Sequence, residues 1–223
     1  MVRSFRADPV EPDLVDRLVA DALRAPTAGN TRGVEWLVLQ GPAETGAYWA
    51  ATTTAAWRAT SRRWPGLSRA PVVALALTSP AAYVERYGEP DKASAGLGPV
   101  PAGAGGDDAG PGEDPAGGER RDAGPGVAPP GRAQAAWPVP YWFGDAAFSA
   151  MTLLLGATAA GLGACFLGNF RGEGELLGVL GVPDGWRLFG TVLLGFPDGG
   201  DHRSASLDRR VGPRSASVHH GRW

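Results

Sequence analysis

The stretch DAAFSAMTLLLGATAAGL, residues 145–162, carries the strongest fold signal in the chain. A helix that is apolar almost all round needs cover on most of its surface. We therefore expect this long helix to be buried at the centre of the molecule, with Asp145 capping its N-terminus. The next residues, ACFLGNF at 164–170, are typical of a strand followed by a turn.

Helices and strands alternate on both sides of this segment. Leu14, Leu18 and Ala22 recur at helical spacing, Asp8 is a candidate N-cap, and Pro26 ends the pattern. The run APVVALALT at 70–78 is apolar throughout, as in a strand covered on both faces. The pattern predicts helices at 12–24, 44–63, 80–87 and 174–182, and further strands at 34–40 and 187–197. We therefore predict an α+β fold, in which helices flank a mixed or antiparallel central sheet.

One segment differs sharply from the rest in composition. Residues 98–132 are about half Gly or Pro and contain no aromatic side chain. Such a segment cannot bury enough apolar surface to offset a backbone-ordering cost of roughly 1–2 kcal/mol per residue. The composition predicts a disordered insertion within a single domain spanning residues 1–223, because neither flank alone carries a complete set of elements.

Bulk properties exclude several classes of protein. The net charge of −2 argues against a nucleic-acid-binding groove, and no apolar run reaches the length of a membrane span. The N-terminus has charges but no apolar run, unlike a secretory signal. Cys165 is the only cysteine, so no intrachain disulfide forms, and we expect a reducing, cytoplasmic compartment.

Catalytic motifs are scarce. The three histidines lack metal-ligand spacing, and no G-x-S-x-G elbow is present. The sequence GLGACF has Phe166 where a dinucleotide fingerprint needs its third glycine. Cys165 is typical of a small buried apolar residue. The protein is therefore either a binding module or an enzyme whose chemistry belongs to a cofactor, with no metal.

Two arginine clusters are candidate anion sites. The N-terminal RSFR offers Arg3, Ser4 and Arg6, and DRR near the other end offers Arg209 and Arg210. Paired guanidinium groups suit a phosphate. The alternative for both clusters is a solvated run of charge.

Polar and aromatic segments add candidate binding groups. In RAPTAGNTRGVEW, residues 24–36, Thr27 and Asn30 supply hydrogen-bonding groups, and Gly29 allows close backbone approach to a flat ligand. An ordinary turn is the alternative. The aromatic WPVPYWF, residues 137–143, is either core packing or a stacking wall for a planar substrate that includes Tyr141 and Trp142.

Together these segments resemble the nitroreductase family of FMN enzymes. RSFR resembles its phosphate-binding start, and APTAGNTRGVEWLVL resembles its A-P-S-x-x-N-x-Q-P-W segment. The 145–170 stretch resembles its central helix and Gly-Leu-Gly turn. LFGTVLLGFP resembles its penultimate strand, and RRVGP its closing phosphate-binding arginine.

The resemblance implies a set of cofactor-binding residues and a reaction. Hydride passes from NADH or NADPH through FMN to a nitroaromatic or quinone acceptor, in a ping-pong cycle. A backbone N–H near the ring stabilises the reduced flavin. Arg32 stands where the family usually has glutamine, and its positive charge would either stabilise the anionic reduced flavin or select an anionic substrate. The phosphate contacts are Arg3, Ser4, Arg6, Arg209 and Arg210, and the flavin contacts are Thr27, Ala28, Asn30, Arg32, Gly168 and Asn169.

The resemblance also implies a homodimer with an FMN in each of two interface clefts. We further expect the polar tail from Asp208 to Trp223 to extend over the partner, with Trp223 at its end as the anchor. Two other activities stay open. One is an FMN-dependent dehydrogenase or oxidase of a dedicated metabolite, and the other is a flavin-binding protein without turnover.

Overall fold

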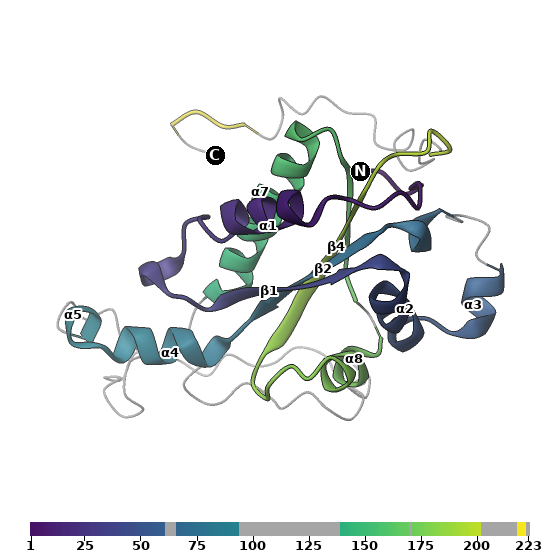
Figure 1. Cartoon of the computed structure of the whole chain (residues 1–223). Coiled ribbons are helices and arrows are strands. Elements are labelled where there is room, and N and C mark those ends of the chain that lie inside the picture. Colours follow the sequence, from purple (N-terminus) through teal and green to yellow (C-terminus); the bar gives the residue numbers. More distant parts are fainter. Residues whose placement is uncertain (61–65, 94–138, 170, 202–217, 222–223) are drawn as a thin grey trace.

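A four-stranded antiparallel sheet forms the centre of the described structure (Figure 1). The computed structural model describes residues 1–60, 66–93, 139–169, 171–201 and 218–221. The strands lie in the order β1-β2-β4-β3, and each pair is antiparallel. Their bounds are β1 Val34–Gln40, β2 Val72–Thr78, β3 Gly163–Leu167 and β4 Arg187–Gly195. All four lie where the sequence predicts strands.

Strand β2 is buried along its whole length, which confirms the prediction of a strand covered on both faces. Its side chains alternate between two cores, as the period of two in a strand requires. Val72 and Ala74 belong to one core, and Val73, Leu75 and Leu77 belong to the other. The sheet therefore separates two hydrophobic layers.

Helices cover both faces of the sheet (Figure 1). Helix α1 (Pro12–Ala22) and helix α7 (Tyr141–Ala159) pack on one core, and α2 (Gly41–Thr52) and α8 (Glu173–Val179) pack on the other. This arrangement confirms the α+β class with an antiparallel sheet. The other helices among the described residues are the 3-10 turns Ala28–Asn30 and Leu67–Arg69, and α3 (Ala55–Thr60), α4 (Pro80–Gly88) and α5 (Pro90–Ala93).

The prediction that Asp145 caps the central helix is wrong. Helix α7 begins four residues earlier, at Tyr141, after Pro140. Asp145 is therefore inside the helix, where it is buried and contacts distant parts of the chain. Burial of α7 is also one-sided in this single chain. Phe148, Met151 and Leu155 are 55–64% exposed on the face away from the core.

Two other helix predictions need correction. Asp8 does not cap α1, which begins at Pro12. Its carboxylate lies 3.1 Å from Arg6 instead. The helix predicted at 44–63 is divided into α2 and α3. Thr53 bonds back to the carbonyl of Trp49, and the Thr54 hydroxyl accepts the N–H of Trp57. Threonine hydroxyls compete in this way with helical bonding and favour helix ends.

Some predictions fall outside the described residues. The insertion at 98–132 lies within 94–138, and Arg209 and Arg210 lie within 202–217. The predicted tail is described only at 218–221. The single-domain organisation and the insertion therefore stay predictions. None of the described helices combines the length and the apolar character that crossing a bilayer requires.

Candidate functional site

The loop between α1 and β1 adopts an unusual backbone conformation. Ala28–Asn30 form a single 3-10 turn, in which Gly29 has a φ of +66° and Asn30 a φ of +56°. Among non-glycine residues, asparagine accepts this left-handed region most readily, because its short polar side chain bonds locally. Asn30 is the one described non-glycine residue with positive φ. The surroundings must therefore hold this turn in place, as is common at functional sites.

Contacts from inside the turn and from two helices hold it. The N–H groups of Asn30 and Thr31 donate to the carbonyls of Thr27 and Ala28. The Thr31 hydroxyl also donates to the Ala28 carbonyl, at 2.6 Å. From α7, the Asp145 carboxylate accepts the Ala28 N–H at 2.7 Å. From α4, the Arg86 Nε donates to the Gly29 carbonyl at 2.9 Å. The turn is thus fixed between α4 and α7.

Tyr83 completes the support beneath the loop. Its hydroxyl donates to Asp145 at 2.8 Å, and its ring meets Trp142 edge-on. Burial, aided by the Asp145 carboxylate, raises the pKa of Tyr83, so the phenol stays a proton donor. For Trp142, which is buried against Tyr83, the structure supports the core-packing alternative. Tyr141, one residue earlier, is 38% exposed.

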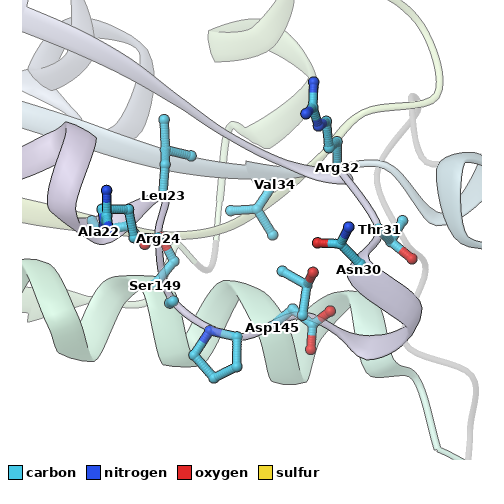
Figure 2. A pocket seen from close by; sticks show the side chains of 12 residues that line it. Ala22, Leu23, Arg24, Asn30, Thr31, Arg32, Val34, Asp145 and Ser149 are labelled. Atoms are coloured by element: carbon cyan, nitrogen blue, oxygen red, sulfur yellow. The ribbon is translucent and has the colours of Figure 1, made fainter.

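A cleft of about 610 Å³ opens beside this loop (Figure 2). Figure 2 shows the Asn30 side chain turned toward the space that Val34 and Asp145 also line, with Arg32 pointing away from it. Within the described part of the chain, the Thr27 hydroxyl and the Asn30 amide have no hydrogen-bond partner. These two groups are therefore available to a ligand, whereas most of the loop's backbone bonds inward.

The predicted phosphate residues lie at another corner of the sheet. Phe5 bridges to Pro197, and the Val2 N–H donates to the Ala164 carbonyl, which fixes the N-terminal segment across the start of β3. The Arg3 N–H donates to Asp201 at 3.0 Å. Arg6 is exposed, stacks on Phe196, and pairs with Asp8.

Ser4 lies in a small cluster of charged groups. Its buried hydroxyl donates to the Asp198 carboxylate at 2.8 Å, and the Arg69 guanidinium also pairs with that carboxylate. The Gly200 N–H donates to the second Asp198 oxygen at 2.7 Å. The Gly200 N–H and the Ser4 hydroxyl lower the pKa of Asp198 below its usual range. This corner therefore already binds an anionic group of the chain itself, the Asp198 carboxylate.

The turn after β3 is anchored by the Asn169 side chain. Its carbonyl oxygen accepts the Thr191 hydroxyl at 2.9 Å, and its amide nitrogen donates to the Tyr48 hydroxyl at 3.3 Å. Both ends of the amide are thus used within the chain. Gly168, the residue before it, is exposed. The backbone of this turn, rather than the asparagine side chain, is what faces outward.

One chain brings only some of the predicted residues together. Thr27, Ala28, Asn30 and Arg32 share one loop, which leads into the Val34 end of β1. The Arg3–Arg6 segment and the Gly168–Asn169 turn lie at the two ends of β3, the opposite edge strand. Residues along a strand are about 3.3 Å apart, and neighbouring strands are about 4.8 Å apart. The loop and Ser4 are therefore separated both along the strands and across the sheet. The sheet and its helices lie between them.

Sequence reasoning missed the residues that hold these groups. Asp145 stands out in the sequence as a charged residue at the start of an apolar helix, but we predicted only that it caps the helix N-terminus. Tyr83, Arg86, Arg69 and Asp198 gave no local signal, because the contact by which each supports the site joins it to a partner at least 57 residues away.

Comparisons with known proteins agree with this fold. The sequence model described as the Nitroreductase family matches residues 1–98 and 132–196. No curated protein matches the sequence. An FMN-dependent nitroreductase from Clostridium difficile R20291 is similar in structure, with a TM-score of 0.58, 15% identity, and coverage of 100% of this chain and 94% of that one.

Two further solved structures are similar. A nitroreductase family protein from Streptococcus pneumoniae TIGR4 has a TM-score of 0.56 at 19% identity, covering 96% of this chain and 94% of that one. NfrA2 of B. megaterium has a TM-score of 0.62 at 14% identity, covering 100% and 70%. The chain belongs to the nitroreductase family. The oxidoreductase class implied by the sequence resemblance is therefore confirmed.

Proposed function

We propose that this protein binds FMN and passes reducing equivalents from NADH or NADPH to an electron-poor acceptor of the nitroaromatic or quinone type, in a ping-pong cycle. The observation that carries the proposal is the Thr27–Asn30 loop, which is held from two helices and leaves a hydroxyl and an amide available at a cleft. Such groups suit the polar edge of a heterocycle. One structural neighbour is itself an FMN-dependent nitroreductase.

The Ser4 corner suits the phosphate end of FMN. The Ser4 hydroxyl, the Arg69 guanidinium and the Gly200 N–H already converge on a carboxylate. The same donor types bind phosphate oxygens. We propose that Arg3, Ser4, Arg6, Arg209 and Arg210 hold the cofactor phosphate, with the Asp198 carboxylate giving up the Ser4 hydroxyl when FMN binds.

Other proposed contacts surround the ring. Bound FMN supplies hydride exchange between a nicotinamide and an acceptor. Thr27, Ala28 and Asn30 would line the ring and the ribityl chain. The Arg32 side chain points away from the cleft of its own chain (Figure 2), so its proposed contribution is positive charge near the loop. The backbone at Gly168 and Asn169 donates N–H groups toward the negative charge of the reduced ring. Of the two aromatic candidates, Tyr141 is the proposed substrate-lining residue, because it is partly exposed, whereas Trp142 is buried against Tyr83.

We propose that two copies of the chain build each site. In one chain the loop and the Ser4 corner belong to opposite edges of the sheet, so a shared cofactor needs the loop of one copy and the β3 edge of the other. Phe148, Met151 and Leu155 form an exposed apolar stripe on α7, of the kind that marks interfaces. A homodimer would bury this stripe and would also bring the loop of one copy next to the β3 edge of the other.

The proposed compartment is a reducing cytoplasm, on the evidence of the single, buried Cys165.

Anaerobic titration of the purified protein with NADH and NADPH tests the proposed activity. We expect bound FMN, bleaching of its visible absorbance by one or both nicotinamides, and reoxidation by nitroaromatics or quinones. A yellow protein that neither nicotinamide reduces would instead indicate the dehydrogenase or oxidase alternative, or a flavin-binding protein without turnover. A protein that does not bind FMN would contradict the proposal.

A further inference from the structure

A buried carboxylate connects the core of the molecule to the loop at the candidate site. Asp145 is 3% exposed, and its Oδ2 atom accepts two hydrogen bonds, from the Ala28 N–H and from the Tyr83 hydroxyl. These partners come from the loop and from α4, while Asp145 itself is on α7. A carboxylate buried this deeply costs free energy unless donors compensate it. The position of the Asp145 carboxylate is therefore coupled to the position of the Ala28 amide.

Helix α4 fixes the next peptide group of the same loop. Arg86 donates to the Gly29 carbonyl, and its remaining nitrogens pair with Asp91 and Glu89, which orient the guanidinium. The Tyr87 ring lies so close to Gly29 that an added Cβ would approach it to 2.7 Å. The Ala28 N–H and the Gly29 carbonyl are thus held by groups of opposite charge from two different helices.

The consequence appears at the neighbouring residues. With Ala28 and Gly29 held from within, the side chains of Thr27 and Asn30 are the polar groups that the loop leaves to a ligand. Asn30 also keeps a positive φ, which a loosened loop would relax. Preorganised contacts of this kind avoid the cost of ordering a loop when a ligand binds.

We propose that Asp145 is a positioning residue of the flavin site, and that its hydrogen bond to Ala28 sets the conformation in which Thr27 and Asn30 meet the ring. This inference rests on the proposed function. Asp145 itself does not contact the reacting atoms. Its negative charge strengthens the bond to Ala28, since charge-assisted hydrogen bonds are about twice as strong as neutral ones.

Three variants separate positioning from general stability. Asp145→Ala removes both hydrogen bonds, whereas Asp145→Asn keeps an acceptor oxygen of the same size in the same place. Thr45→Ala is the matched control, because Thr45 is another buried polar residue, with a hydrogen bond to Gly41, far from the loop. Its loss affects stability without touching the candidate site.

The first measurement uses the protein without cofactor. In NMR spectra of selectively labelled protein, a strong hydrogen bond to a carboxylate shifts the Ala28 amide proton downfield and protects it from exchange with solvent. We expect Asp145→Ala to move this resonance upfield and to speed its exchange, Asp145→Asn to restore most of the protection, and Thr45→Ala to change neither. An unchanged Ala28 amide in a folded Asp145→Ala protein would overturn the proposal.

The second measurement is FMN affinity. We expect Asp145→Ala to raise the Kd about tenfold or more and Asp145→Asn to raise it by less than about threefold, because only the first loses both bonds. We expect Thr45→Ala to lower the melting temperature and to keep the wild-type Kd. Wild-type affinity in Asp145→Ala would overturn the positioning role. Failure of the wild type to bind FMN would count against the proposed function, and the Ala28 amide would still report whether Asp145 holds the loop.

Discussion

The hydroxyl of Ser4 donates a hydrogen bond to the carboxylate of Asp198, 2.8 Å away and 194 positions later in the chain. This bond joins the N-terminal segment to the residues that follow β4. It also puts a negative charge at the corner proposed for the cofactor phosphate. The lowered pKa of Asp198 keeps this carboxylate ionised near neutral pH.

Asp198→Asn therefore tests the phosphate assignment. Two like charges about 5 Å apart repel by about 1 kcal/mol even in water, so removing one should lower the FMN Kd about fivefold. The effect should shrink as salt is added. Asp184→Asn, an equal change of charge at an exposed position, should leave the Kd unchanged. Weaker FMN binding by Asp198→Asn would mean that the phosphate lies elsewhere.

Arg210→Ala tests the C-terminal half of the same site. A lost charged hydrogen bond costs about 1.5–3 kcal/mol, so the FMN Kd should rise roughly tenfold or more. Arg214→Ala, which removes the same charge four positions later, serves as control and should have a much smaller effect. Equal effects of the two variants would point to general electrostatic attraction rather than a specific phosphate contact.

The Arg86–Asp91 pair predicts a pH dependence of stability. The Arg86 side chain lowers the pKa of Asp91 to about 2, from 3.8. Because the folded-state pKa is the lower one, the pair stabilises the fold above about pH 4, and this contribution disappears as pH falls toward 2. In urea titrations, wild type should therefore exceed Asp91→Asn in stability at pH 6, and the difference should vanish as pH approaches 2. If the stability difference between wild type and Asp91→Asn stays constant from pH 6 to pH 2, the Arg86–Asp91 ion pair is not its cause.

The exposed stripe on α7 predicts the oligomeric state. Met151→Lys and Leu155→Lys put a charge into the proposed interface, so light scattering should detect a shift from dimer to monomer, together with loss of FMN. Val179→Lys, an equivalent change at a 65% exposed position on α8, should leave the dimer intact. A wild-type protein that is a yellow monomer would show that one chain builds the whole site.

Deleting residues 100–131 tests the predicted insertion. Replacement with a short Gly-Ser linker should leave the melting temperature and flavin content nearly unchanged, because loop length contributes little to closure entropy. Thermal unfolding and the flavin-to-protein absorbance ratio are the measurements. Retained FMN with a large loss of turnover would indicate instead that the segment acts over the flavin.

Local sequence patterns were enough to predict the individual strands and most of the helices. The apolar run at 70–78 predicted a strand covered on both faces, and β2 is buried along its whole length. Periodicity also located β1, β4 and helix α4, because side-chain spacing along a strand or helix is a property of neighbouring residues. The family resemblance rested on the order of such segments, and the family match confirms it.

The tertiary structure alone decided what holds the candidate site. Asp145 follows a glycine at the start of an apolar run, as a cap would, yet its partners are Ala28 and Tyr83, 117 and 62 positions away. Likewise, the partner of Ser4 is a carboxylate at the far end of the chain. Sequence spacing describes a residue's neighbours along one helix or strand. Which buried donor meets which acceptor depends on how the elements pack, and that is fixed only when the sheet and its two helical layers come together.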